Sequence, residues 1–378
     1  MKIVCDDRIP FLHGVFEPWA EVLYLPGGEI GPADVRDADA LVTRTRTRCD
    51  ASLLEGSSVR VIATATIGYD HIDTAWCEAR GIVWKNAPGC NSGSVEQYIA
   101  SVLVHLLRRR GLDPGGLTLG VVGAGNVGAK VMRIASLLGM KLLVNDPPRA
   151  RREGAEGYVS LDELVGRSDI VTLHVPLSRE GEDATWHLFD ARRLAAMRPG
   201  QILVNSSRGP VVDGAALADA LRGDRLGGAV LDVWEGEPDI DRELLDMLDL
   251  ATPHIAGYSA DGKAAGTTAA VRTVAACLGL PLEDWTPGVL PAPPQPLEFS
   301  PDCSGKQPAG LLAEAVAYSY DVASDDRRLR EAPELFEYQR GHYPVRREFG
   351  AFTVRLSGAA PGSAALLEKA GFNVVEMR

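Results

Sequence analysis

The sequence lacks the features that mark secreted, membrane-bound and disulfide-rich proteins. Its six cysteines are scattered and form no C-x-x-C pair, so neither a disulfide framework nor a redox motif is indicated. No run approaches the roughly 18 consecutive apolar residues of a membrane span. The first residues contain no apolar segment followed by a cleavage site. We therefore expect a cytoplasmic protein with reduced thiols and no membrane partner.

Positive charge is also scarce. The chain has 39 Lys and Arg against 51 Asp and Glu, a formal net charge of −12. Such a surface repels phosphodiester backbones and anionic lipid, so we expect no nucleic-acid partner, and an anionic substrate must meet a local basic pocket. No metal site is expected. With 378 residues, of which 46% are hydrophobic, the chain is long enough for two or three domains.

Glycine, by contrast, is abundant, at 40 of 378 residues. Many glycines fall between short aliphatic runs that alternate with helical stretches. This alternation predicts an α/β fold with parallel sheets flanked by helices. The predicted strands are Lys2–Cys5, Ala40–Thr43, Val59–Thr64, Ile82–Trp84, Leu117–Val122, Lys141–Val144, Ile170–His174, Ile202–Asn205 and Gly228–Asp232.

A helix is predicted between the fourth and fifth of these strands. Ser94 and Gln97 have the spacing of a capping box, and apolar residues recur at helical spacing as far as Leu107. Three arginines, 108–110, then fall at its C-terminal end, with Gly111 as the stop. They have two interpretations: a solvated helix end that suits the helix dipole, or an anion site.

A glycine-rich segment directly follows the strand that ends at Val122. It reads Gly123-Ala124-Gly125-Asn126-Val127-Gly128 and opens an apolar helix, which is the context of a dinucleotide-binding loop. The glycines let the backbone approach a pyrophosphate, and the helix N-terminus favours its charge. The alternative is a structural strand-to-helix turn.

An acidic residue, Asp146, ends the next predicted strand, 18 residues after Gly128. At this position a carboxylate can accept hydrogen bonds from the adenosine ribose, which favours NAD over NADP because a 2′-phosphate would face a like charge. Arg149 nearby weakens that preference. Asp146 can instead be read as a turn residue at the strand end.

Four polar residues follow later strands. Arg208 and Asp232 fall at or just beyond strand ends, where ligands bind in an open α/β sheet, and Glu237 and His254 lie in the connections that follow. A nicotinamide enzyme acting on an anion needs a cation and a proton carrier of near-neutral pKa. Taken singly, Arg208 could form a structural salt bridge, Glu237 could be a turn acid before Pro238, and His254 could be a core histidine.

These motifs in this order resemble the D-isomer-specific 2-hydroxyacid dehydrogenases. The segments are S-S-R-G around Arg208, D-V-W-E-G-E-P around Glu237 and P-H-I-A-G around His254, and the resemblance covers essentially the whole chain. It implies that Arg208 binds the substrate carboxylate, that His254 takes the C2 hydroxyl proton, and that Glu237 orients His254. The hydride then passes from C2 to NAD.

The resemblance also implies further cofactor contacts. Asp232 matches the position that contacts the nicotinamide carboxamide region, and Val175 and Gly257 match positions that approach the cofactor. Related sequences often carry Thr where this chain has Val175, so only a backbone contact is expected there.

N-terminal and C-terminal segments are most similar to family members that oxidise a phosphorylated four-carbon acid, 4-phospho-D-erythronate, in pyridoxal phosphate biosynthesis. The substrate contacts implied are Arg44, Thr45, Thr66 and Tyr258. An alternative is that Arg44, Arg46 and Arg48 simply alternate along an exposed strand end. A further hypothesis is that Arg346 or Arg347 reaches the phosphate pocket of a dimer partner.

Two other functions remain open. One keeps the chemistry and changes the acid to glycerate, hydroxypyruvate or 3-phosphoglycerate. The other is an NAD-sensing binding protein like the corepressors that share this fold, because fold alone does not fix function.

Three domains are expected. Residues 1–92 with 258–285 form a flavodoxin-like substrate domain, and residues 93–257 form a Rossmann-type, doubly wound NAD-binding domain. Six prolines between Pro281 and Pro296 predict a linker. Residues 286–378 then form a small α+β domain that makes a homodimer. Closure of a cleft between the first two domains is expected on binding.

Overall fold

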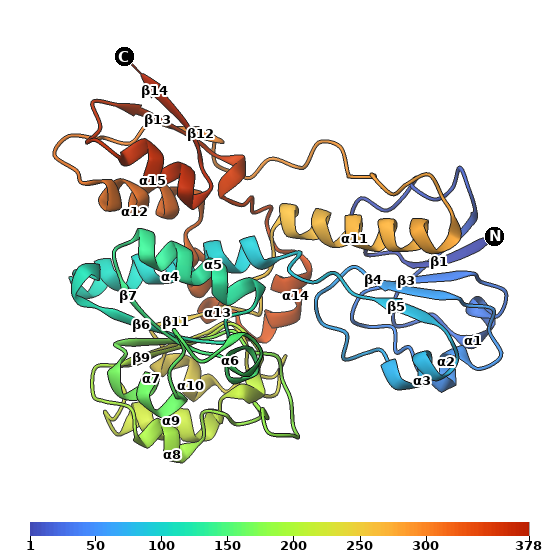
Figure 1. The fold of residues 1–378 in the computed structure, drawn as a ribbon, viewed down its shortest axis with the longest axis horizontal. Helices are drawn as coiled ribbons and strands as arrows, with labels where there is room; N and C mark the ends of the chain where they lie inside the picture. The colour runs from blue at the N-terminus through green and yellow to red at the C-terminus, as the bar shows by residue number, and fades with distance from the viewer. Residues whose placement is uncertain (378) are drawn as a thin grey trace. The chain divides into compact units, whose positions relative to one another are not determined.

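The structure, a computed structural model that describes residues 1–377, is α/β throughout (Figure 1). Backbone contacts divide it into two units. The first consists of residues 1–91 and 259–291, and the second of residues 92–258 with the chain from 292 onward. Each unit is built on its own parallel sheet.

The first unit has a five-stranded sheet in the order β2-β1-β3-β4-β5, with all neighbours parallel. The strands are β1 (Lys2–Asp6), β2 (Glu21–Leu25), β3 (Ala40–Thr43), β4 (Val61–Thr64) and β5 (Val83–Lys85). This is the flavodoxin-like strand order. The edge strand β2 was not predicted from the sequence, although residues 22–25 are a continuous apolar run; in the structure it is only partly buried.

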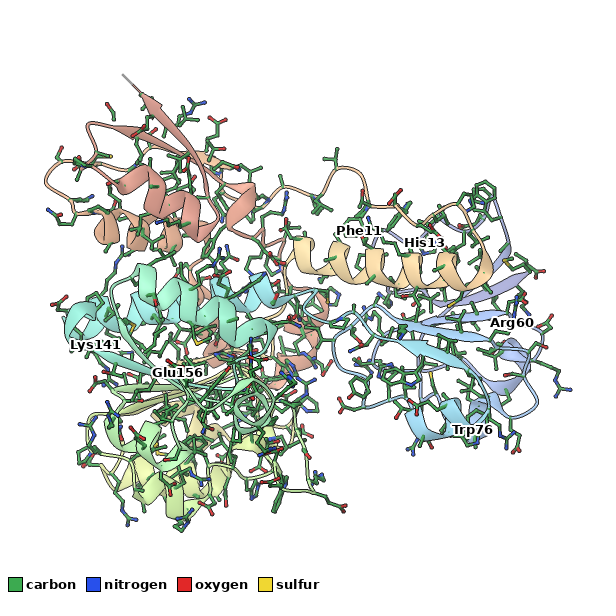
Figure 2. The ribbon with its side chains drawn as sticks, viewed as in Figure 1. Phe11, His13, Arg60, Trp76, Lys141 and Glu156 are labelled. Carbon is green, nitrogen blue, oxygen red and sulfur yellow. The ribbon has the colours of Figure 1, made fainter. Side chains whose placement is uncertain are left out.

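Helices cover both faces of this sheet (Figure 1). The short helices α1 (Pro32–Val35), α2 (Ala51–Leu54) and α3 (Thr74–Ala79) pack on one face, and the long helix α11 (Ala260–Leu278) packs on the other. Thr267 of α11 donates a hydrogen bond to the carbonyl of Pro10. The loop after β1 therefore runs along this helix, and Figure 2 shows Phe11 and His13 beside it.

The second unit has a six-stranded parallel sheet in the order β11-β10-β9-β8-β6-β7. The strands are β6 (Thr118–Val122), β7 (Lys141–Asn145), β8 (Ile170–Leu173), β9 (Ile202–Asn205), β10 (Gly228–Leu231) and β11 (Leu250–Ala251). The strand order reverses between β6 and β8. In a doubly wound sheet the crevice at such a reversal is where ligands bind.

Two layers of helices enclose this sheet (Figure 1). Helices α4 (Ser92–Arg110) and α5 (Asn126–Leu137) pack on one face; α7 (Leu161–Arg167), α8 (Ala191–Ala195), α9 (Gly214–Arg222) and α10 (Arg242–Met247) pack on the other. Helix α6 (Pro147–Glu153) follows β7. The Rossmann-type fold expected from the sequence is confirmed.

The C-terminal region adds a three-stranded parallel sheet and four helices. Its elements are β12 (Glu298–Phe299), α12 (Pro308–Ser319), α13 (Val322–Glu331), α14 (Phe336–Gly341), β13 (Thr353–Ser357), α15 (Ser363–Ala370) and β14 (Asn373–Met377). Short 3-10 turns lie at Pro114–Gly116, Gly209–Val211, Pro333–Leu335 and Phe349–Ala351. Leu312 of α12 and Leu367 of α15 share one core with Leu103 of α4. This shared core explains why the C-terminal region belongs to the same unit as the six-stranded sheet. The three-domain division stays a prediction.

The predicted capping box of α4 is wrong. The helix begins at Ser92, two residues before Ser94, so both residues lie inside it. The Ser94 hydroxyl donates to Glu348 at 2.8 Å, and the Gln97 amide donates to the Arg347 carbonyl at 2.8 Å. The pair therefore binds the C-terminal region rather than the helix terminus.

Arg110, at the other end of α4, has a structural role. Arg110 pairs with Asp249 at 2.8 Å and donates to the carbonyl of Gly227, which ties the helix end to the start of β10 and β11.

No helix within residues 1–377 is long and apolar enough to cross a lipid bilayer.

Candidate active site

The glycine loop lies between β6 and α5, at the point where the strand order reverses. Gly123 has φ +90°, a conformation that favours glycine, and its N–H donates to Asn145. A Cβ on Gly128 would overlap the Gly123 carbonyl, and the side chain of Val175 lies beside Gly123. Gly125, the N-cap of α5, has no side chain to cap the helix. The exposed N–H groups of the first turn, which includes Asn126 and Val127, therefore suit a pyrophosphate.

Asp146 links the end of β7 to this loop. One carboxylate oxygen accepts from the backbone N–H of Ala124 at 2.8 Å, and the other accepts from that of Arg149 at 3.0 Å. Asp146 therefore also serves as a turn residue, as the alternative interpretation held. Each carboxylate oxygen has a second lone pair, so these bonds leave acceptor sites for ribose hydroxyls. The Arg149 guanidinium is engaged by Glu153.

Arg208 follows β9 on a backbone that Asn205 fixes. The Asn205 side-chain oxygen accepts from the backbone N–H and the hydroxyl of Ser207, and its amide donates to the Arg208 carbonyl at 2.9 Å. The next residue, Gly209, lies so close to the Trp234 carbonyl that a Cβ would overlap it. The loop that carries Arg208 therefore packs directly against the loop after β10. Gly209 was not predicted as part of the site, because nothing in the sequence places it against Trp234.

His254 and Glu237 form a hydrogen-bonded pair. His254 Nδ1 lies 2.7 Å from one Glu237 oxygen, and the other oxygen accepts from the Trp234 N–H at 2.8 Å. Burial disfavours the charged carboxylate, but the hydrogen bond and charge of His254, with the Trp234 N–H, outweigh it and lower the pKa of Glu237. His254 has φ +56°, and its side chain is 31% exposed. Nδ1 thus faces the carboxylate, which leaves Nε2 to exchange a proton.

Asp232 holds the loop that carries His254. Its side chain is buried, and it accepts from the N–H groups of Ile255 at 2.7 Å and Ala256 at 2.9 Å. The Thr252 hydroxyl donates to it at 2.7 Å, and the Tyr98 hydroxyl lies 2.8 Å from that of Thr252. Burial raises the pKa of Asp232. The structure thus gives Asp232 a supporting role. Its contact with the nicotinamide stays a prediction, as does the approach of Gly257 to the cofactor.

Comparison with known proteins agrees with this geometry. Residues 96–256 match the family described as D-isomer specific 2-hydroxyacid dehydrogenase, NAD binding domain. An erythronate-4-phosphate dehydrogenase of Bacteroides fragilis is 46% identical over 94% of this chain and 99% of its own length. The chain belongs to the D-isomer-specific 2-hydroxyacid dehydrogenases. It is an NAD-dependent oxidoreductase.

Further relatives of this dehydrogenase include enzymes of the same name and a solved structure of the same family. An erythronate-4-phosphate dehydrogenase of Pseudomonas entomophila is 43% identical over 99% of both chains. A D-lactate dehydrogenase of Aquifex aeolicus, solved with NAD and lactic acid, is 26% identical with a TM-score of 0.63. That structure aligns over 97% of its own chain but 75% of this one. Residues 296–371 match a domain of unknown function, DUF3410.

The proposed substrate contacts of this dehydrogenase lie in different units. Arg44, Thr45 and Thr66 follow β3 and β4, which are parallel neighbours, so they share one edge of the first sheet. The Thr64 hydroxyl lies 2.8 Å from that of Thr66, and Arg44 donates to a backbone carbonyl at 2.8 Å. Arg48 instead pairs with Asp50 at the surface, as the alternative interpretation held.

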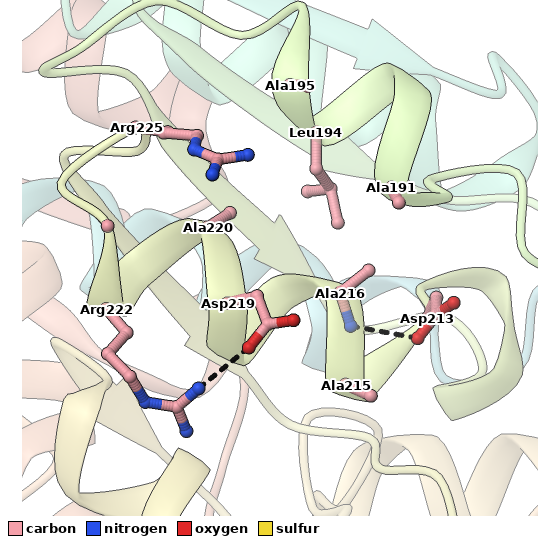
Figure 3. Close-up of a pocket in the computed structure, with 11 residues that line it drawn as sticks. Ala191, Leu194, Ala195, Asp213, Ala215, Ala216, Asp219, Ala220, Arg222 and Arg225 are labelled. Carbon is pink, nitrogen blue, oxygen red and sulfur yellow. Dashed lines mark hydrogen bonds and ion pairs between the residues drawn. The ribbon is translucent and has the colours of Figure 1, made fainter.

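A separate pocket of the dehydrogenase, between α8 and α9, contains neither the glycine loop nor the His254–Glu237 pair. It is lined by alanines and by charged side chains, of which Asp219 is paired with Arg222 and Asp213 caps α9 (Figure 3). Within residues 1–377 no cluster of three His, Cys, Asp or Glu side chains could hold a metal ion. The strand ends of the second unit therefore remain the candidate site.

Proposed function

We propose that this dehydrogenase oxidises 4-phospho-D-erythronate at C2 to 2-oxo-3-hydroxy-4-phosphobutanoate, with NAD as the acceptor, in pyridoxal phosphate biosynthesis. Similarity to erythronate-4-phosphate dehydrogenases along nearly the whole chain supports this substrate. The observation that supports the reaction type is the hydrogen-bonded pair of His254 Nδ1 and Glu237, 2.7 Å apart. The loops that carry this pair and Arg208 all follow strands at the same edge of the second sheet.

Each residue of the proposed site has a distinct task. The Arg208 guanidinium binds the C1 carboxylate through two parallel hydrogen bonds. His254 Nε2 accepts the proton of the C2 hydroxyl, and the Glu237 carboxylate stabilises the imidazolium that forms. The glycine loop and Asp146 would hold NAD, which would supply the acceptor for the hydride from C2. Arg44, Thr45, Thr66 and Tyr258 bind the remainder of the substrate and its phosphate.

The test is a spectrophotometric screen of the purified enzyme. NAD and NADP are each combined with 4-phospho-D-erythronate, 3-phosphoglycerate, glycerate and D-lactate, and NADH formation is followed. We expect the highest kcat/KM with 4-phospho-D-erythronate and NAD. A higher kcat/KM for an unphosphorylated acid would reject the substrate and leave the reaction class intact.

Replacing Glu237 with glutamine changes the pH dependence of the reaction. The lowered pKa of Glu237 keeps this carboxylate ionised throughout the working pH range, so its own protonation does not produce the acid limb. Without the negative charge the imidazolium is less stable. We therefore expect the acid limb of oxidation to move to lower pH and kcat to fall about 10- to 100-fold. Rate profiles from pH 5 to 10 measure both effects; an unmoved acid limb would contradict the pairing.

We further propose that the enzyme is a cytoplasmic homodimer whose contacts lie in the C-terminal region. Arg346 takes no part in reaching the partner, because its side chain is buried within its own subunit and bound to Ala256. Light scattering of the full chain measures the oligomeric state directly. A monomer at micromolar concentration would reject this proposal.

A further inference from the structure

Arg346 is a buried cation in the C-terminal region. It is 4% exposed, and its Nη2 donates to the carbonyl of Ala256 at 2.6 Å and, at 3.4 Å, to that of Ser94. Its guanidinium lies over the Tyr320 ring at 4.5 Å and the Tyr343 ring at 5.8 Å. Within residues 1–377 its Nε and Nη1 have no hydrogen-bond partner. Such a group is costly to bury, so packing alone does not account for it.

The carbonyl that Arg346 binds belongs to the loop from His254 to Tyr258, which we call the catalytic loop. The N–H of Ala256 donates to Asp232 at 2.9 Å while its C=O accepts from Arg346. A carboxylate and a guanidinium thus hold this one residue from both sides. His254, in a left-handed conformation, lies two residues before Ala256, and Tyr258 lies two residues after it.

A second line of contacts leads from the C-terminal region to the same loop. The hydroxyls of Tyr320 and Tyr343 both donate to one oxygen of the buried Asp325, at 2.7 Å and 2.6 Å. Arg328 pairs with the other oxygen. Tyr258 packs edge-on against Tyr343, with ring centroids 6.0 Å apart. The two tyrosines that lie against Arg346 are therefore themselves fixed, and one of them contacts the end of the catalytic loop.

This support belongs to the C-terminal region, outside residues 96–256 that match the NAD-binding domain of the family. The D-lactate dehydrogenase neighbour aligns over nearly its full length and leaves a quarter of this chain without a counterpart. Arg346, Tyr320, Tyr343 and Asp325 all lie within residues 296–371, the segment that matches a domain of unknown function. A role of this segment in dimerisation alone would not require a buried guanidinium on the catalytic loop.

We propose that Arg346 is a positioning residue that fixes the loop from His254 to Tyr258 through the Ala256 carbonyl, so that the C-terminal region completes the active site of its own subunit. The inference rests on the proposed role of His254. The positive charge of Arg346 also interacts with the negative charge of Asp232, the buried carboxylate that holds the same loop. Loss of the guanidinium would free the Ala256 carbonyl and remove this attraction.

The test compares Arg346→Met with Arg355→Met in the full-length enzyme. Arg355, on β13 of the same region, forms a partly exposed ion pair with Glu298, so its loss should leave the catalytic loop unchanged. We expect Arg346→Met to lower kcat about 10- to 100-fold, since misplacement by an ångström costs about this much, with a smaller change in KM for NAD. Deuterium exchange should become faster at the amides of Ile255 and Ala256, whereas both readouts stay at wild-type values in Arg355→Met.

A second variant allows a decision even if the first does not fold. If Arg346→Met does not fold, Arg346→Lys decides: it keeps the charge and loses the planar group over Tyr320, so kcat should fall several-fold and exchange at the loop should be faster. Wild-type kcat and wild-type exchange in whichever variant folds would overturn the proposal. All variants are assayed with the acid that the wild-type enzyme prefers. A wild-type enzyme inactive on 4-phospho-D-erythronate therefore rejects the proposed substrate without affecting this result.

Discussion

Replacing His254 with asparagine is expected to lower kcat for hydroxy-acid oxidation about a thousandfold, within the range that general acid–base catalysis contributes. Asparagine retains a side-chain donor for Glu237 and removes the imidazole that accepts the substrate proton in the proposed mechanism. NADH affinity, measured by fluorescence titration, should stay near the wild-type value because the glycine loop is untouched. Steady-state kcat at saturating substrate gives the effect.

The matched control is His342→Asn in the same unit. His342 is exposed at the end of α14, where its Nδ1 lies 3.0 Å from the Tyr338 carbonyl. This variant should keep wild-type kcat. Full activity of His254→Asn on the preferred acid would remove the proton carrier from the proposed mechanism.

Replacing Arg208 with lysine is expected to lower kcat/KM for the acid about 100-fold or more, chiefly through KM. A lysine keeps the positive charge but cannot donate two parallel hydrogen bonds to a carboxylate. The rest of the loop should be preserved, because Asn205 binds the Arg208 backbone carbonyl and the Ser207 N–H rather than the Arg208 side chain. Initial rates over a range of substrate concentrations separate KM from kcat.

Arg222→Lys is the control for this variant. Arg222 lies on α9, is 54% exposed and pairs with Asp219, so a lysine there should leave all kinetic constants unchanged. An Arg208→Lys enzyme with wild-type kcat/KM would show that the charge alone is sufficient and would contradict the two-pronged binding of the carboxylate.

The parts of the fold that the sequence predicted are those in which local pattern and tertiary environment agree. The central strands, such as β9 and β10, are buried on both faces, so their sequences are continuous apolar runs bounded by polar or glycine residues. Edge strands were predicted only in part: β5 and β7 were found and others were missed. β2 is partly exposed and β11 has two residues, and neither was predicted.

The capping-box prediction failed for a related reason. Ser94 and Gln97 have the correct spacing, but the same side chains hydrogen-bond to Glu348 and Arg347, about 250 residues later in the sequence. Local propensity cannot anticipate a partner so distant in the chain. The same contacts explain why the C-terminal region shares a core with α4.

The sequence by itself determined the family, and it predicted the cofactor loop and the site residues Arg208, Glu237 and His254, because close backbone approach to a phosphate and proton transfer each require particular residue types at fixed places along the chain. Only the tertiary structure decided that Glu237 binds His254 Nδ1, that Gly209 packs against Trp234, and that Arg346 supports the catalytic loop. These contacts join segments that lie apart in the sequence and follow different strands or helices. Their geometry depends on how the sheets and helices pack, and a pattern in neighbouring residues carries no record of that packing.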